Sequence, residues 1–234
     1  MISIRKIFAI CEKDFKGLSR NLFVLSGLVI VPIMAFLMGR GLYDEYSAQV
    51  ATMFVTMNIM MNGANIICVM IAEEKEKYTL NVLSASTVSG LDFLLSKMLV
   101  TIVLTIVGNL LVYFMFGLLD SIPVGPFLLI TSVAILPAAA IGAVIGIATK
   151  TQAAASSAVA PLAMIPILLP IIVPAESAAW DVLQYLFTEQ VVDGLRSVYY
   201  SESFVSNLGI IGINFAVLFV VFLLFFKKKG LASE

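Results

Sequence analysis

Apolar residues fill six long stretches of the chain, and charged residues lie almost entirely between those stretches. A helix that crosses a bilayer needs about 20 mostly apolar residues. Six uncharged runs reach or approach this length: residues 21–39, 46–72, 98–119, 121–149, 151–175 and 203–226. The pattern therefore predicts an all-α integral membrane protein with six transmembrane helices, organised as a single transmembrane domain over residues 1–234. Pro123 and Pro126 open the fourth run, so we expect its helix to begin near Phe127.

The distribution of positive charge predicts how the spans are oriented. Cytoplasmic segments of membrane proteins are enriched in lysine and arginine. With both termini in the cytoplasm, all fourteen lysines and arginines except Arg40 and Arg196 fall on the cytoplasmic side. An odd number of spans would place the basic cluster at 227–229 outside. We therefore predict six spans and two cytoplasmic termini, so that 73–97 is a cytoplasmic segment and 176–202 is an outer one.

Composition supports a membrane protein and narrows the possible chemistry. The chain is 61% hydrophobic and 12% charged, whereas soluble domains carry about 25% charged residues. It has no histidine, which removes the commonest metal ligand and the commonest general base. Cys11 and Cys68 lie far apart and outside the predicted outer segments, so we expect no disulfide. No basic patch with interleaved aromatic residues is present, which argues against nucleic acid as a partner.

The N-terminal segment, residues 1–20, has the pattern of an amphipathic helix. Its apolar residues recur at helical spacing, with charged residues between them: Ile4, Ile7, Phe8, Cys11, Phe15 and Leu18. The pattern predicts a helix that lies in the membrane interface and contacts the lipid bilayer, with a solvated tail as the alternative. The charges also argue against a cleavable signal peptide.

The second run carries a polar stripe within an apolar stretch. Asn58, Asn62 and Asn65 recur on one helix face, and Met57 and Met61 lie beside them. Amides in a bilayer are costly unless paired or hydrated, so these side chains should face protein or a water-filled cavity. Two interpretations remain open. One is a substrate pathway in which methionine adapts to varied apolar shapes, and the other is amide-to-amide contact between packed helices.

Prolines and small residues mark the fourth and fifth runs. Pro161, Pro166 and Pro170 each lack a backbone donor, so we expect the fifth helix to be broken near a pathway, with a kinked but continuous helix as the alternative. The fourth run contains three small residues four apart: Ala138, Gly142 and Gly146. This spacing favours a close helix crossing, although glycine is also generally tolerated in membrane helices.

The longest outer segment, residues 176–202, alternates apolar and polar residues at helical spacing. We predict one or two short amphipathic helices there, and a return into the membrane remains open.

The cytoplasmic stretch 73–97 opens with a dense charge cluster and then mixes polar and apolar residues. On a short helix Tyr78 and Val82 share one face, while Leu80 and Leu83 share another. A loop that needed only solvation would not carry apolar groups on two sides. The stretch therefore predicts a short helix pressed between the membrane and a partner protein. Ser89 is placed to cap the helix of the third run.

Motifs for independent catalysis or energy supply are missing from the sequence. It contains no Gly-x-x-x-x-Gly-Lys-Ser/Thr loop, and no carboxylate lies inside a predicted span. A proton- or sodium-coupled carrier usually keeps an ionisable group inside the bilayer. We therefore expect a chain that is not an enzyme, holds no cofactor or metal of its own, and receives energy from a partner.

The stretch 73–89 resembles the loop between spans 2 and 3 of ABC-2 type permeases. That family tends to show an acidic and basic cluster, then Thr-Leu, then Leu, then Ser-Pro-Val-Ser. The matching residues are 73–83 and 86–89. Thr87 stands where proline is usual, and Lys77-Tyr78 stands where Arg-Gly is usual. The basic amphipathic start, Pro32 in span 1 and the six spans also fit the family.

The resemblance implies a permease that pairs with a second copy or a related permease and docks nucleotide-binding ATPase subunits, which hold ATP and Mg²⁺. The segment 73–89 would then be a coupling helix seated on the ATPase. The residues expected to contact the ATPase are Glu73, Glu74, Glu76, Tyr78, Thr79, Leu80, Val82 and Leu83. Spans 2 and 5 line the pathway in that family, which assigns these residues to it: Met57, Asn58, Met61, Asn62, Asn65, Pro161, Pro166 and Pro170.

The function expected from the resemblance is ATP-driven export across a bacterial cytoplasmic membrane. The methionine-rich, amide-striped second span favours an amphipathic or hydrophobic substrate such as a peptide or drug. The alternatives are export of a lipid, polysaccharide or ion, a stand-alone channel or carrier, or a membrane scaffold or immunity protein outside the ABC class.

Overall fold

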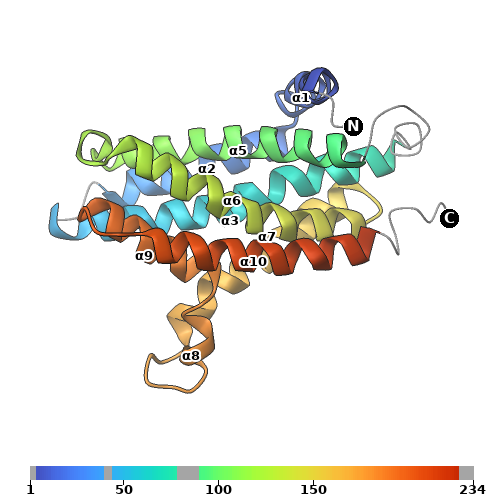
Figure 1. Cartoon of the computed structure of the whole chain (residues 1–234). Helices are drawn as coiled ribbons and strands as arrows, with labels where there is room; N and C mark the ends of the chain where they lie inside the picture. Colours follow the sequence, from blue (N-terminus) through green and yellow to red (C-terminus); the bar gives the residue numbers. More distant parts are fainter. Residues whose placement is uncertain (1–3, 40–43, 78–89, 227–234) are drawn as a thin grey trace.

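The computed structural model of the chain describes residues 4–39, 44–77 and 90–226, and all regular secondary structure in these ranges is helical. The helices are α1 (Ile4–Leu18), α2 (Leu22–Gly39), α3 (Asp44–Glu76), α5 (Gly90–Met115), η1 (Leu119–Ser121), α6 (Val124–Ala148), α7 (Gln152–Ile172), α8 (Trp180–Leu183), α9 (Phe187–Tyr199) and α10 (Val205–Phe225). Figure 1 shows the long helices running side by side in one bundle.

Six helices account for the six apolar runs. Five of them (α3, α5, α6, α7 and α10) are long and apolar enough to cross a membrane. The sixth, α2, is a shorter apolar helix of 18 residues, which at 1.5 Å per residue spans about 27 Å and so approaches the hydrocarbon thickness of a bilayer. The predicted all-α, six-span membrane fold is confirmed.

The second span, α3, forms the centre of the bundle and packs against α2, α5, α6, α7 and α9. Its closest approach is to α6. A Cβ added to Gly142 would lie 2.0 Å from the carbonyl oxygen of Ala64, and one added to Gly146 would lie 2.8 Å from that of Cys68. Glycine at these two positions lets the two backbones touch. The small residues of the fourth run therefore serve close packing, as the first of the two interpretations held.

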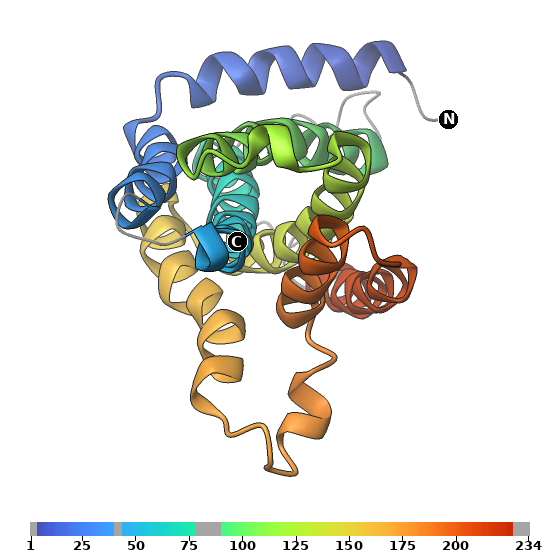
Figure 2. The same cartoon turned by 90° about the vertical axis from the view of Figure 1, so that its left-hand side faces the viewer.

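The N-terminal helix α1 lies across the bundle at a steep angle to the spans and contacts α5 (Figure 2). Ile7 and Leu18 are buried against the bundle, whereas Ile4 and Phe8 are exposed. The predicted amphipathic helix is confirmed and the solvated tail is not, while the position of this helix in the membrane interface stays a prediction. The end of the bundle at which α1 lies is called the α1 end; the last turn of α10 also lies there, with Phe222 in the same apolar cluster as Leu18.

The fifth span, α7, is one continuous helix, so the prediction of a broken helix is wrong. Pro170 has no N–H to donate to the carbonyl of Pro166, four residues earlier. The hydroxyl of Thr188 in α9 donates to that carbonyl at 2.7 Å. A side chain from another helix replaces the missing donor, and the helix continues past the proline.

The start of α6 also differs from the expectation. The helix begins at Val124, three residues before Phe127, with Pro123 in the N-cap position. Pro126 falls in the first turn, where a backbone N–H has no partner inside the helix, so the missing donor costs nothing.

The predicted outer segment, residues 176–202, contains two short helices, α8 and α9, within the range of one or two that was expected. Figure 1 shows α8 set away from the bundle, while α9 returns to it. Val191 and Leu195 of α9 are fully buried, because the helix packs against α3, α6 and α10. Gly194 allows this contact, since a Cβ there would lie 2.1 Å from the end of the Ile130 side chain.

Candidate functional site

The charged start of the predicted coupling segment belongs to α3. Glu73, Glu74 and Glu76 lie in the last turn of this helix, which runs four residues beyond the apolar stretch that ends at position 72. The predicted contacts further along lie outside the described residues: Tyr78, Thr79, Leu80, Val82 and Leu83, and with them the proposed cap Ser89. The part of the site that the structure describes is therefore the last turn of α3, which precedes this segment.

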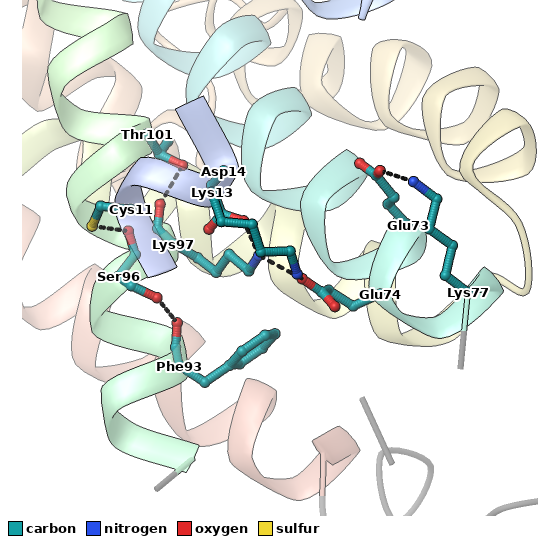
Figure 3. A network of polar contacts seen from close by, with 10 residues as sticks. All are labelled: Cys11, Lys13, Asp14, Glu73, Glu74, Lys77, Phe93, Ser96, Lys97 and Thr101. Atoms are coloured by element: carbon teal, nitrogen blue, oxygen red, sulfur yellow. Dashed lines mark hydrogen bonds and ion pairs between the residues drawn. The ribbon is translucent and has the colours of Figure 1, made fainter. Parts of the chain in front are cut away.

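Glu74 points into the protein and takes part in a buried group of charges (Figure 3). Its side chain is 5% exposed, and its Oε1 accepts hydrogen bonds from Nζ of Lys13 at 2.6 Å and Nζ of Lys97 at 3.2 Å. Lys97, only 1% exposed, also donates to Oδ1 of Asp14 at 2.7 Å. Lys13 and Asp14 come from α1, Glu74 from α3 and Lys97 from α5. This charge cluster of Lys13, Asp14, Glu74 and Lys97 thus joins three helices.

The balance of charge explains how these groups remain buried. Two carboxylates face two ammonium groups, and an isolated charge in the same place would carry a large desolvation cost. Burial raises the pKa of Asp14 above the usual range of a carboxyl group, while the nearby Lys97 ammonium acts in the opposite direction. Lys97 also lies 5.1 Å from the centre of the Phe93 ring, which adds a cation–π contact.

The neighbouring thiol of Cys11 completes the contact between α1 and α5. Its Sγ donates to the backbone oxygen of Ser96 at 3.5 Å. Burial and the Asp14 carboxylate raise the pKa of this thiol, so it is held in its protonated, weakly nucleophilic form at neutral pH.

On its other side, the last turn of α3 holds the connection between α6 and α7. Nζ of Lys75 donates to the backbone oxygens of Ile147 and of Thr149, the latter at 2.8 Å. Oε2 of Glu76 accepts from the backbone N–H of Gln152, the first residue of α7, at 2.8 Å. A cation thus sits at a helix C-terminus and an anion at a helix N-terminus, where the helix dipoles favour each of them. The remaining acid, Glu73, pairs with the exposed Lys77 one turn later.

The predicted asparagine stripe faces the chain's own helices. Asn58 is fully buried and donates to Oδ1 of Asn109 at 2.7 Å and to the backbone oxygen of Thr105 at 3.2 Å. Asn62 donates to Oδ1 of Asn58 at 2.6 Å and to the backbone oxygen of Gly27 at 3.1 Å. Two glycines make room for these amides, because a Cβ at Gly108 would lie 2.7 Å from Asn58 and one at Gly27 would lie 2.8 Å from Asn62. Within the described chain, these two asparagines act as contacts between α2, α3 and α5.

The other predicted pathway residues lie at different places. Asn65 is buried on the side of α3 that faces Gly27. Met57 and Met61 are half-exposed, on a different face of α3 from the amides. Along α7, Pro161 is exposed, Pro166 is half-buried and Pro170 is buried. The structure therefore does not gather these residues into one lined surface within a single chain.

A second polar stripe, on α5, was missed by reasoning from the sequence. Its members recur every four residues and are 0–1% exposed: Lys97, Thr101, Thr105, Asn109 and Tyr113. Strict four-residue spacing of polar residues through an apolar run was the signal that could have revealed it. The stripe begins at the charge cluster and includes Thr105 and Asn109, whose backbone and side-chain oxygens accept hydrogen bonds from Asn58. Polar contacts therefore join α5 to α3 at two places, at Lys97 and at Asn58.

No metal site emerges from the described residues, because no three acidic or cysteine side chains there lie close enough together to hold an ion. The arrangement is suited to holding helices together at one end of a membrane bundle.

Comparison with known proteins identifies the class of molecule. A family model described as ABC-2 family transporter protein matches residues 16–227, which include all six spans. A search of curated proteins finds no match. The family model covers nearly the whole chain and agrees with its all-helical, multi-pass fold. The chain belongs to the ABC-2 transporter family and is a membrane permease, the translocation component of an ABC transporter.

Proposed function

We propose that the chain is the membrane subunit of an ATP-driven exporter and takes its energy from separate nucleotide-binding ATPase chains. The observation that carries the proposal is the anchoring of the last turn of α3. Three consecutive side chains there hold α1 and α5, the end of α6 and the start of α7. The rest of the segment 73–89, which resembles a coupling helix, follows this turn in the sequence. A force applied to that segment would reach most of the bundle.

The proposed ATPase contact consists of Tyr78, Thr79, Leu80, Val82 and Leu83. Glu73 and Glu76 border this segment. Glu74 is buried among lysines of its own chain, so we assign it an anchoring role and leave it out of the contact surface. ATP and Mg²⁺ are held by the partner chains, and this chain supplies the membrane path.

The proposed setting is a bacterial cytoplasmic membrane with both termini in the cytoplasm. Helix α1, which carries basic residues, and the C-terminal end of α10 lie at the same end of the bundle, which supports this orientation. The functional unit is a pair of permeases, made with a second copy or a related chain. Exposed apolar side chains on α2 and α7, such as Leu37, Ile165 and Ile172, face lipid or this second chain.

The proposed substrate is an amphipathic or hydrophobic molecule such as a peptide or drug. The half-exposed Met57 and Met61 offer a soft apolar surface on the central helix. Lipid, polysaccharide or ion export is the alternative within the same class.

The test is purification of the full-length protein from its native membrane in mild detergent. We expect it to bring down a nucleotide-binding chain, and the paired change Leu80→Asp with Leu83→Asp to release that chain without reducing membrane insertion. The matched control is Val182→Asp, at an exposed position on α8, far from the α1 end. A protein that purifies without an ATPase and shows no ATP-dependent transport in vesicles would contradict the proposal and favour a scaffold or immunity role.

A further inference from the structure

We infer that Glu74, Lys75 and Glu76 are positioning residues that divide the movement of the coupling segment between two separate parts of the bundle. One arm, through Glu74, leads to α1 and α5. The other arm, through Lys75 and Glu76, leads to the connection between α6 and α7. The inference rests on the proposed function, because it concerns how a force from the ATPase would enter the membrane domain. The turn made by residues 73–76 is called the anchor turn.

The geometry of an α-helix makes this division possible. Successive residues point about 100° apart around the helix axis, so three consecutive side chains reach three different directions. In the anchor turn each of these directions ends on a different helix or helix terminus. A single turn can therefore act on several helices without a dedicated linker.

The Glu74 arm is a buried ionic connection. Lys97 bridges Glu74 and Asp14, so α1 is bound to α3 through a residue of α5 (Figure 3). Lys13 adds a direct contact from α1 to Glu74. Separating the partners of a buried ion pair is strongly destabilising. We therefore expect α1, α3 and α5 to move together at this end.

The arm formed by Lys75 and Glu76 binds both ends of the short connection between α6 and α7. Lys75 binds the carbonyl oxygen of Thr149, just after the end of α6, and Glu76 binds the first N–H of α7 at Gln152. Between these atoms the chain has only Lys150 and Thr151. A shift of the anchor turn would therefore act at the start of α7, the proline-containing span.

The body of α3 is suited to receiving such a shift, because it is packed backbone to backbone against α6 at Gly142 and Gly146. Side chains cannot rearrange to absorb movement where no side chain intervenes. A shift of α3 would therefore reach α6 through this packing, whereas the polar contacts of the anchor turn act at the start of α7.

The experiment uses the complex with its ATPase and two reporter cysteines, each placed singly in a Cys11→Ser background. One reporter is Phe8→Cys on α1, and the other is Ser157→Cys on α7; both positions are exposed. The labelling rate of each by a maleimide is measured with and without a non-hydrolysable ATP analogue. We expect the analogue to change the rate at both reporters in the parent.

The variants then separate the two arms. Glu76→Ala should abolish the response at Ser157→Cys and keep the response at Phe8→Cys, whereas Glu74→Gln should do the reverse. Glu76→Gln, which keeps an oxygen acceptor for the Gln152 N–H, should retain the response on α7. The matched control Lys77→Met, whose lysine is exposed and pairs with Glu73, should leave both responses intact.

Several outcomes would overturn the inference. If the complex stays intact and Glu76→Ala either preserves both responses or abolishes both, the anchor turn does not divide the movement and the inference is wrong. If Glu74→Gln fails to fold, Lys13→Met tests the same arm through its exposed partner, and an unchanged response at Phe8→Cys then counts against that arm. A parent protein that brings down no ATPase chain refutes the proposed function itself and the inference with it.

Discussion

Replacement of Lys97 by methionine is the sharpest test of the charge cluster. The change keeps an unbranched side chain of similar length and removes the ammonium group. Two buried carboxylates, Asp14 and Glu74, then lose their shared partner, and only Glu74 retains a lysine, the largely exposed Lys13. Breaking a buried ion pair by removal of one partner costs about 3–5 kcal/mol.

The structure indicates where this free energy is lost. Asp14 is the only acid of the cluster that belongs to α1, and its second oxygen, Oδ2, has no hydrogen-bond partner among the described residues. Without Lys97, α1 can relieve the buried charge by leaving the bundle or by protonation of Asp14, whose pKa burial already raises. A loss of about 3–5 kcal/mol corresponds to a shift of roughly 100-fold or more in the equilibrium between docked and undocked α1.

Hydrogen–deuterium exchange of α1 measures this equilibrium directly, because docked and undocked helices exchange at different rates. We expect faster exchange throughout residues 4–18 in Lys97→Met, with little change in α6. The matched control is Lys16→Met on the same helix, where the lysine pairs with exposed Glu12 and should contribute little. Equal exchange of α1 in the two variants would refute the reasoning that the cluster holds α1 in place.

Three further predictions concern packing and access. Gly142→Ala places a Cβ 2.0 Å from an α3 carbonyl oxygen, so it should lower the free energy of unfolding of the purified protein by about 1–3 kcal/mol. The control Gly212→Ala, where a Cβ has nothing within 4 Å, should leave this free energy unchanged. Thr188→Val removes the donor to the carbonyl that a proline frees in α7 and should cost about 1 kcal/mol in the same unfolding assay; an unchanged midpoint would show that this carbonyl needs no partner. A maleimide should label the partly exposed Cys11 slowly and the buried Cys68 only after denaturation, and rapid labelling of Cys68 in the folded protein would contradict the packing of α3.

The features that were predicted well from the sequence are those set by the membrane or by one helix alone. The length of each apolar run fixed the six spans, since every backbone polar group in a bilayer must be satisfied within its own helix. The apolar spacing of residues 1–20 gave α1 for the same local reason. Neither feature depends on contacts with distant residues.

The features that were missed depend on partners far along the chain. Glu74 was expected to contact the ATPase, yet its side chain is bound by Lys13 and Lys97 of its own chain, which lie 61 and 23 residues away. Pro170 predicted a break, but a hydroxyl 22 residues from the freed carbonyl of Pro166 repairs the helix. The four-residue stripe on α5 was readable in principle, although hydroxyl groups in an apolar run do not by themselves indicate which side is buried.

We propose that this 25.3 kDa chain acts as a paired membrane subunit with separate ATPases. Native mass spectrometry of the complex released from its own membrane measures this composition. We expect an assembly of two permease-sized chains and two nucleotide-binding chains, with the latter lost when Leu80 and Leu83 are both changed to aspartate. An intact membrane protein that is observed only alone, or only with copies of itself, would contradict it.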